Sequence, residues 1–527
     1  MSPLSPPPPL PLLHATIFFV PCCVSAIDCE FRYAEVIFRD AASGTPLSYV
    51  PGVDFVASFW VVRYPYDEQG AASVATSSPE LDAVFSLAAT TIKTTTLDFY
   101  ADSNTRQRSI DCMADDTTAA LNHYGTTTEL AFPRMTAGQI MGITGLGYLS
   151  SNWADWTILP GLNVFYDALF TGDLSLAELY FDVLVSNHTY AFLIDSSTKL
   201  VHNGNGLSAL IDTSGGSDDG YHQSPVNSVV NAWSYLALRS FASLAKWLNR
   251  ASDAAALSAT ADALALAFQA AMYNGSSAIC DGLCSATPHT AAHATFYALY
   301  SGILDGAAYK PQLVEFLMAR MAQNGDLGMP CGSYPAQFLL GGLYNADSDH
   351  GNAAFAVLTS TKKHSWLHMM EAFGATATME CWLPEELDNL SFSHIWSSSP
   401  SFSIPWLFFG LTPTAPGFAA FTVKPQVGPV VRGSATLPSA AGPIAISFEQ
   451  SGEKPGTPQS TFALRLTVPG GTVAKALLPL WGCAQGGMAV TLDGATVAWV
   501  PEGDYAAVQG ILPGEHYLTT SPCQTIG

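Results

Sequence analysis

The sequence predicts a mainly α-helical body followed by a C-terminal antiparallel β-sandwich. A helical period of apolar residues continues for roughly 300 residues from residue 78 onward. Short alternating runs separated by turns fill the chain after Pro413, and a small strand-rich segment precedes the helices. The chain has 527 residues, more than one hydrophobic core accommodates, so we expect more than one domain.

The first 77 residues contain two segments. Residues 15–20 form a short apolar run, and Val24-Ser25-Ala26 has the small-x-small form of a signal-peptidase site. We therefore interpret residues 1–27 as a signal peptide, which would imply secretion, or as a spurious start, because no basic residue precedes the run. Residues 28–77 alternate apolar and polar side chains in FRYAEVIF and DFVASFWVV, which predicts a remnant N-terminal β segment.

Residues 78–411 carry the helical period. Leu81, Val84, Phe85 and Ala88 follow the i, i+3, i+4, i+7 spacing of one helix face. Wide apolar stripes run through residues 226–247 and 257–272, and Asn274-Gly275 closes the second stripe. Further helices are expected at 176–186, 290–304, 311–323, 335–345, 350–360 and 365–373.

Residues 412–527 contain the short runs of the expected sandwich. These runs are FTVKPQV, GPIAISFEQ, STFALRLTVPGG, AKALLPLW, AVTLDG, ATVAWV and HYLTT.

Charge restricts the class of partner. With 43 acidic and 20 basic residues, the net charge of -23 disfavours nucleic acid and anionic membranes, because few basic groups are available to neutralise phosphates. Beyond the first residues we find no continuous apolar stretch of the roughly 20 residues that a membrane helix needs. We expect a neutral partner, no membrane contact and a globular chain.

Residues 374–405 combine a carboxylate with aromatic and hydroxyl side chains. Glu380 lies between Met379 and Trp382, and partial desolvation there would raise its pKa toward the range useful for proton transfer. Trp382 and Trp396 could offer flat apolar faces to a sugar, while His394 could bond its hydroxyls. This pattern indicates a carbohydrate site, although a buried aromatic cluster with an incidental glutamate gives the same sequence.

Cysteine and histidine come together once. Cys280 and Cys284 precede His289 and His293, a spacing open to three interpretations: a zinc site, a small local disulfide, or two free thiols. The sequons at Asn187, Asn274 and Asn389 matter only if the chain is secreted.

Several segments resemble the α-L-rhamnosidases. They are GATATMECW, LSFSHIW, the run from LFFGLTPTAPGF to AISFE, DSNTRQR, NWADWTILP, DDGYHQSPVNSVVNAW, HTAAHA, GSYPAQFLLGGLY and HSWLHMM. Along the chain these segments occur in the same order as in that family, and the resemblance spans roughly residues 30–520. The resemblance implies an (α/α)6 barrel for residues 78–411, hydrolysis of terminal α-L-rhamnose with inversion, and no cofactor. Some members of the family hold a calcium ion, but we find no ligand cluster for such a metal in this sequence.

The resemblance also assigns roles to single residues. Glu380 matches the general base, Asp102 and Arg106 match residues that hold the rhamnose hydroxyls, and His394 matches a sugar-contacting histidine. Five further positions match the wall of the site: Trp153, Asp155, Trp156, Asp219 and Tyr221.

One position departs from the family pattern. Gln107 stands where the family has its acid glutamate, and an amide cannot donate an acidic proton. A following family aspartate corresponds to Asp115, one position late, with Asp111 and Asp116 nearby. Asp115 or Asp111 would then protonate the leaving group, unless these aspartates only favour a helix start.

Three hypotheses follow. The first is an α-L-rhamnosidase with Glu380 as base, and the second is a catalytically impaired rhamnose-binding relative, because of Gln107. The third is another (α/α)6 glycosidase or a lyase, although a lyase would need basic residues that the loops around Glu380 largely lack. The sequence leaves the rhamnoside, its linkage and the oligomeric state open.

Overall fold

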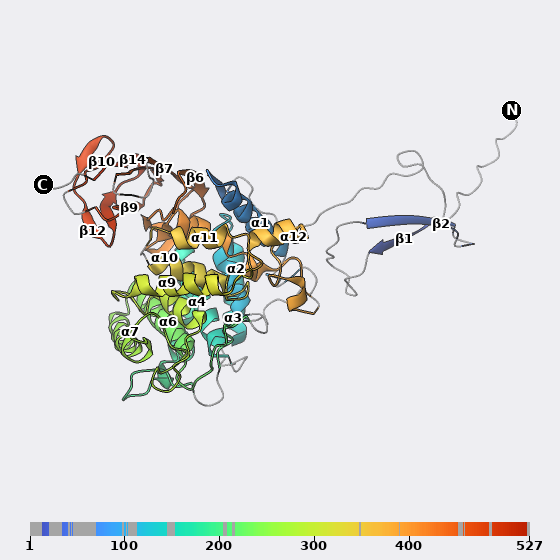
Figure 1. Cartoon of the computed structure of the whole chain (residues 1–527), viewed down its shortest axis with the longest axis horizontal. Helices are drawn as coiled ribbons and strands as arrows, with labels where there is room; N and C mark the ends of the chain where they lie inside the picture. Colours follow the sequence, from blue (N-terminus) through green and yellow to red (C-terminus); the bar gives the residue numbers. More distant parts are fainter. Residues whose placement is uncertain are drawn as a thin grey trace.

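The computed structural model describes most of the chain. Figure 1 shows the helices gathered in one body, with the C-terminal strands beside them. The described residues are 13–19, 34–40, 43, 45, 70–96, 100, 101, 103, 113–144, 153–203, 208–212, 217–346, 349–388, 390–451, 457, 459–483 and 487–523.

The predicted helices are confirmed, and others lie between them. The longer helices are α1 (Pro79–Thr95), α2 (Met113–Tyr124), α3 (Ala131–Thr144), α4 (Ala154–Thr171), α5 (Ser175–Asn187), α6 (Ser228–Trp247), α7 (Ala251–Met272), α8 (Ala292–Ser301), α9 (Lys310–Gln323), α10 (Ala336–Ala346), α11 (Asn352–Leu358) and α12 (Trp366–Phe373). Short segments are η1 (Ala191–Leu193), η2 (Pro384–Glu386), η3 (Ile395–Ser397), α13 (Pro400–Ser403), η4 (Ile404–Phe408) and η5 (Pro416–Phe418).

Side-chain caps fix where two of these helices begin. The Ser78 hydroxyl accepts from the Leu81 backbone N–H at 3.4 Å before α1, and Pro79 takes the first helical position. Asn227 Oδ1 accepts from the N–H groups of Val229 and Val230 at 2.9 and 3.1 Å before α6. These bonds satisfy donors that have no partner inside the helix, so local sequence defines both helix starts.

Helix α7 packs one apolar stripe against the body. Leu257, Leu264 and Phe268 are buried, whereas Leu266 on the opposite side is exposed. By length and composition α7 is the one helix in the described part of the chain that could cross a membrane. Its one-sided burial is the pattern of a helix that covers a core.

The C-terminal strands form two sheets. One sheet has the order β11-β10-β14-β8-β7-β6-β3, and the other has the order β12-β13-β9-β5-β4. Their strands are β3 (Ser73–Thr76), β4 (Leu411–Pro413), β5 (Ala420–Val423), β6 (Arg432–Leu437), β7 (Ile444–Ser451), β8 (Thr461–Val468), β9 (Val473–Pro479), β10 (Val490–Leu492), β11 (Ala495–Val497), β12 (Val500–Glu502), β13 (Tyr505–Ile511) and β14 (Gly514–Thr520).

Two pairings differ from the expected antiparallel C-terminal sandwich. Strand β5 pairs with β9 in parallel, because β6, β7 and β8, which lie between them in sequence, belong to the other sheet. Strand β3, from the expected N-terminal segment, pairs with β6 and completes the edge of the C-terminal sheet. Residues before the helical body therefore contribute to the β domain that follows it.

The two parts share one hydrophobic core. The rings of Phe408 and Phe409, at the end of the helical body, contact Phe448 of β7 with centroid distances of 5.9 and 5.8 Å. On the other side, Phe448 stacks on Phe462 of β8. The helical body thus rests on the inner face of the seven-stranded sheet.

The cysteine spacing is resolved by a covalent bond. Cys280 and Cys284 form a disulfide, so the local-disulfide interpretation is confirmed and the zinc interpretation is wrong, because no thiolate remains to bind metal. A second disulfide joins Cys483 to Cys523.

The N-terminal segments form a hairpin. Strand β1 (Leu13–Phe19) covers most of the apolar run of residues 15–20 and pairs antiparallel with β2 (Ala34–Asp40), which lies in FRYAEVIF. The second predicted run, DFVASFWVV, lies outside the described residues.

Candidate active site

Glu380 is buried and held at both ends. The side chain is 2% exposed, and Oε2 accepts from the Ser391 backbone N–H at 2.9 Å. The Glu380 backbone N–H donates in turn to the Ser391 carbonyl at 3.0 Å. The Glu380 carbonyl accepts from Ser333 Oγ at 2.5 Å and from Trp396 Nε1 at 2.8 Å. Three of these four bonds hold the Glu380 backbone, and the fourth orients its carboxylate.

The two tryptophans near Glu380 have different surroundings. Trp396 lies between His394, at a ring distance of 4.1 Å, and Tyr334, at 5.7 Å. Trp382 is fully buried, donates from Nε1 to the Cys331 carbonyl at 2.8 Å and meets Trp366 edge-on. The expectation that Trp382 offers an open face to a sugar is therefore wrong, because neighbouring aromatic rings enclose it.

His394 lies beside the segment that contains Asp102. The His394 backbone N–H donates to Thr378 at 2.8 Å, and His394 forms an antiparallel bridge with Ser103. Four other predicted site residues, namely Asp102, Arg106, Gln107 and Asp111, lie outside the described residues. Ala101 and Ser103, on either side of Asp102, are described, and Ser103 forms the bridge with His394.

Tyr334 connects Glu380 to a group of carboxyl side chains. Burial raises the pKa of Tyr334 well above its usual range, and the charges of Asp155, Asp115 and Asp212 raise it further. All three aspartates are therefore within electrostatic reach of the Tyr334 phenol. Tyr334 contacts Trp396, and Trp396 donates to the Glu380 carbonyl, so these two aromatic residues connect Glu380 to the phenol on which the three charges act.

Asp115 and Asp155 both come from first helical turns. Asp115 opens α2 and is 2% exposed, and Asp155 opens α4 and is 1% exposed. Burial raises the pKa of Asp155 to about 6, while bonds from the Leu210 N–H to both carboxylate oxygens, at 3.0 and 3.1 Å, oppose the rise. A carboxyl in this range can hold a proton in mildly acidic solution.

The other expected tryptophans border this cluster. Trp153 precedes α4 and is 38% exposed, and its ring meets Trp156 edge-on at 5.3 Å. Trp153 is the more accessible of the two. An exposed indole beside a buried carboxyl is a combination that can bind a sugar ring.

Asp212 is a buried residue that the sequence did not single out. Its Oδ2 accepts from the Gly332 N–H at 2.7 Å and contacts His293 Nε2 at 2.9 Å. His293, once a candidate metal ligand, thus pairs with a carboxylate.

Asp219 lies near Cys331, as Asp212 does. Its Oδ2 accepts from the Ala292 N–H at 2.8 Å and is 3.8 Å from Arg320 Nε. Burial raises the pKa of Cys331, and the charges of Asp212 and Asp219 add to that rise. Both carboxylates therefore lie near Cys331, whose carbonyl holds the Trp382 indole.

Tyr221, one of the residues expected to line the sugar site, is buried and bonds to three neighbouring groups. Its hydroxyl bonds to Asn227 Oδ1 at 2.8 Å, to Ser228 Oγ at 3.0 Å and to the Asp281 carbonyl at 2.9 Å. These partners use the hydroxyl to join the loop before α6 to the loop before α8.

One group in the described residues has metal-ligating side chains. Ligand atoms of His222, Asp281 and His289 lie within 4.8 Å of one another. The Asp281 carboxylate already accepts from His289 Nδ1 at 2.6 Å, from the His222 N–H and from the Ala291 N–H, both at 2.8 Å. This group is a hydrogen-bonded network that positions the loop before α8.

Sequence reasoning missed the residues that hold Glu380 in place. Ser333 comes from a loop remote from Glu380 and Ser391 from the loop of Glu380 itself, and nothing in their spacing predicts the contacts. The one available signal was the position of Ser333 in GSYPAQFLLGGLY, a segment that resembles the family but to which the sequence assigned no role.

Two family models match the chain. The bacterial α-L-rhamnosidase six-hairpin glycosidase domain matches residues 146–408, and the bacterial α-L-rhamnosidase C-terminal domain matches residues 410–486. Together the two matches include Trp153, Asp155 and the whole of the Glu380 region. No curated protein matches the chain significantly.

Solved structures of similar fold agree with the family models. An α-L-rhamnosidase from Dictyoglumus thermophilum has a TM-score of 0.67 and 15% identity, over 86% of this chain and 50% of that one. One from Aspergillus terreus has a TM-score of 0.64 and 16% identity, over 85% and 50%. One from Streptomyces avermitilis, complexed with L-rhamnose, has a TM-score of 0.62 and 18% identity, over 85% and 42%. The chain thus spans half or less of each relative's length, and the likeness establishes the fold.

Proposed function

Because the chain belongs to the α-L-rhamnosidase family, we propose that it is a glycoside hydrolase that removes terminal α-L-rhamnose from a carbohydrate. We further propose that the helical body is an (α/α)6 barrel, as expected from the six-hairpin family. The observation that carries the proposal is the 2% exposed carboxylate of Glu380, which accepts from the Ser391 N–H and whose backbone carbonyl accepts from Trp396 Nε1.

Glu380 acts as the general base of an inverting reaction. Its Oε2 accepts from the Ser391 N–H, and this bond orients the carboxylate that takes a proton from water. The water attacks the anomeric carbon from the face opposite the leaving group, so the product has inverted configuration. A general base of this kind contributes about 10²–10⁴ in rate.

The general acid must come from elsewhere, since Gln107 replaces the family glutamate. We assign this role to Asp115, which is buried at the start of α2 and within electrostatic reach of Tyr334. Asp111 is the other aspartate that the sequence offers as the proton donor. Asp155 is the alternative that a specific observation favours, because its pKa of about 6 suits a proton donor.

Replacing the base is the first test. The purified chain should release 4-nitrophenol from its α-L-rhamnoside, and Glu380→Gln should lower kcat at least 100-fold with a small change in KM. Glu371→Gln, at an exposed glutamate on α12, is the matched control and should keep the wild-type rate. Equal rates for wild type and Glu380→Gln would reject the assignment.

A second function is favoured by Gln107 itself. A chain that binds rhamnose without cleaving it would keep the site and lack the acid. In that case neither wild type nor Glu380→Gln would turn over the substrate, while L-rhamnose would still bind in calorimetry.

Leaving groups of different acidity test the proton donor. Asp115→Asn should slow hydrolysis of an alkyl α-L-rhamnoside far more than hydrolysis of the 4-nitrophenyl compound, because a phenolate needs less protonation to depart. The same comparison for Asp155→Asn decides between the two carboxyls. If both variants slow the two substrates equally, neither aspartate is the acid.

A further inference from the structure

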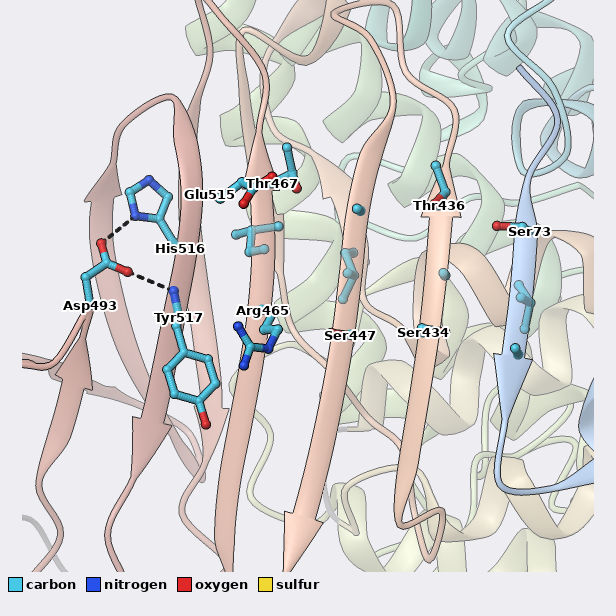
Figure 2. Close-up of a pocket in the computed structure, with 16 residues that line it drawn as sticks. Ser73, Ser434, Thr436, Ser447, Arg465, Thr467, Asp493, Glu515, His516 and Tyr517 are labelled. Atoms are coloured by element: carbon cyan, nitrogen blue, oxygen red, sulfur yellow. Dashed lines mark hydrogen bonds and ion pairs between the residues drawn. The ribbon is translucent and has the colours of Figure 1, made fainter. Parts of the chain in front are cut away.

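The outer face of the seven-stranded sheet carries a hollow of about 490 Å³, far from Glu380 in sequence. Figure 2 shows its floor on β3, β6 and β7, with larger side chains rising from β8 and β14. The volume falls within the range of about 300–1,000 Å³ that is usual for small-molecule sites. A second hollow continues over the same strands and shares several lining residues.

Strand register creates this shape. Ala75, Ser434, Ser447, Arg465 and Tyr517 stand directly opposite one another, strand by strand, from β3 to β14. Small side chains on three strands leave the floor low and line it with hydroxyl groups. Arg465 and Tyr517 form the wall at one end, so the hollow has an aromatic side and a polar floor (Figure 2).

Tyr517 is exposed but firmly positioned. Tyr517 is 38% exposed, and its backbone N–H donates to Asp493 Oδ1 at 2.8 Å. The other oxygen of Asp493 contacts His516 Nδ1 at 2.9 Å. The Arg465 guanidinium lies 4.5 Å from the Tyr517 ring centroid. An exposed aromatic ring that is held in this way loses little entropy when a ligand binds.

Charged groups beside the ring have unused bonding capacity. Within the described residues, neither Arg465 nor Glu515 has an ion pair or a side-chain hydrogen bond. Arg465 offers several N–H donors in a fixed plane, and Glu515, across from Thr467 on the neighbouring strand, offers acceptors. A ligand that fits must therefore both donate and accept, and carry an apolar face for Tyr517.

We propose that this hollow is a second carbohydrate-binding site, which holds a sugar ring of the glycan whose terminus is cleaved near Glu380. The inference rests on the proposed function for the identity of the glycan. A pyranose ring has a C–H face for Tyr517 and neighbouring hydroxyls for Arg465, Glu515 and the serine floor. A protein partner fits less well, because the floor lacks the large apolar side chains that form interface cores. The chain's net charge of -23 disfavours nucleic acid.

The test uses the full chain with Glu380→Gln, so that the glycan is bound and not cleaved. The probe is a soluble rhamnose-containing polysaccharide, and its affinity is measured by calorimetry. Adding Tyr517→Ala or Arg465→Ala should lower the affinity at least tenfold. Phe192→Ala removes an exposed aromatic side chain outside the hollow and should change nothing. With Glu380 intact, Tyr517→Ala should hydrolyse 4-nitrophenyl α-L-rhamnoside within twofold of wild type, since this small substrate does not reach the sheet.

The outcomes separate this inference from the proposed function. Binding that depends on Tyr517 in a chain that hydrolyses nothing would support the sheet site and reject the hydrolase. Hydrolysis by wild type, together with equal affinities for the Tyr517→Ala and Phe192→Ala proteins, would reject the sheet site alone. The absence of measurable binding to the polysaccharide would also overturn it.

Discussion

The backbone carbonyl oxygen of Glu380 accepts two hydrogen bonds, which position the backbone that carries its side chain. Ser333 and Trp396 both donate to this oxygen, and Ser391 holds one carboxylate oxygen. A base that is positioned before substrate arrives avoids reorganisation during the reaction. The sequence indicated Glu380 because Met379 and Trp382 would partly desolvate it and because it matches the family's base, but it gave no indication of Ser333.

Asp155 makes the stability of the fold depend on pH. Its folded-state pKa of about 6 exceeds the usual 3.8, so the folded protein binds the proton more tightly than the unfolded chain does. Stability therefore falls as pH rises from about 4 to about 6. We expect the free energy of unfolding of wild type, relative to Asp155→Asn, to fall by up to about 3 kcal/mol across this window.

Denaturant unfolding at several pH values measures this difference. The exposed Asp388 gives a control, and Asp388→Asn should follow the wild-type pH dependence. A pH dependence that is the same in Asp155→Asn and wild type would show that Asp155 is not perturbed by burial.

At the scale of elements, the first turns of α2 and α4 place two carboxylates within electrostatic reach of Tyr334. Asp115 and Asp155 are each close to a helix N-terminus, where the helix dipole favours negative charge. The sequence analysis allowed this interpretation for Asp115 as an alternative to catalysis. Both residues are buried and act on Tyr334, and the catalytic role of Asp115 stays a prediction.

The junction between the helical body and the β domain depends on a glycine. Gly410 has φ +74°, and a Cβ there would meet the Lys424 carbonyl oxygen, while its own carbonyl accepts from the Lys424 N–H at 3.0 Å. Gly410→Ala should cost at least about 3 kcal/mol, because a left-handed conformation and a backbone clash combine.

Gly275 supplies the matched control for this substitution. It has φ +79° with open space around it, so Gly275→Ala should cost only about 1–2 kcal/mol for the backbone conformation. Thermal unfolding of the two variants measures the comparison. Equal losses would mean that the clash at Gly410 is relieved by movement of Lys424.

Local pattern predicted the elements better than their partners. Helices at 176–186, 311–323 and 365–373 were predicted within about two residues, because a 3.6-residue period is a local property. The parallel pairing of β5 with β9 and the position of β3 beside β6 were not predicted, since alternation identifies a strand but not its neighbour.

At the scale of the whole molecule, the β domain and the helical body depend on each other. β3 precedes α1 and completes the C-terminal sheet, and Phe408 and Phe409 reach the inner face of that sheet. The proposed sugar site lies on the outer face of the same sheet (Figure 2). The family motifs identified the region of Glu380 in sequence, but only the fold brings Asp115, Asp155 and Asp212 within electrostatic reach of Tyr334.

Chemical rescue tests the role of Glu380 most directly. In Glu380→Ala a small anion can occupy the space of the missing carboxylate and attack the anomeric carbon itself. We predict that sodium azide raises the rate at which Glu380→Ala turns over 4-nitrophenyl α-L-rhamnoside at least tenfold above its rate without azide. Proton NMR should identify the product as β-L-rhamnosyl azide. No rescue by azide, or an azide of α configuration, would contradict the assignment of Glu380 as the base of an inverting hydrolase.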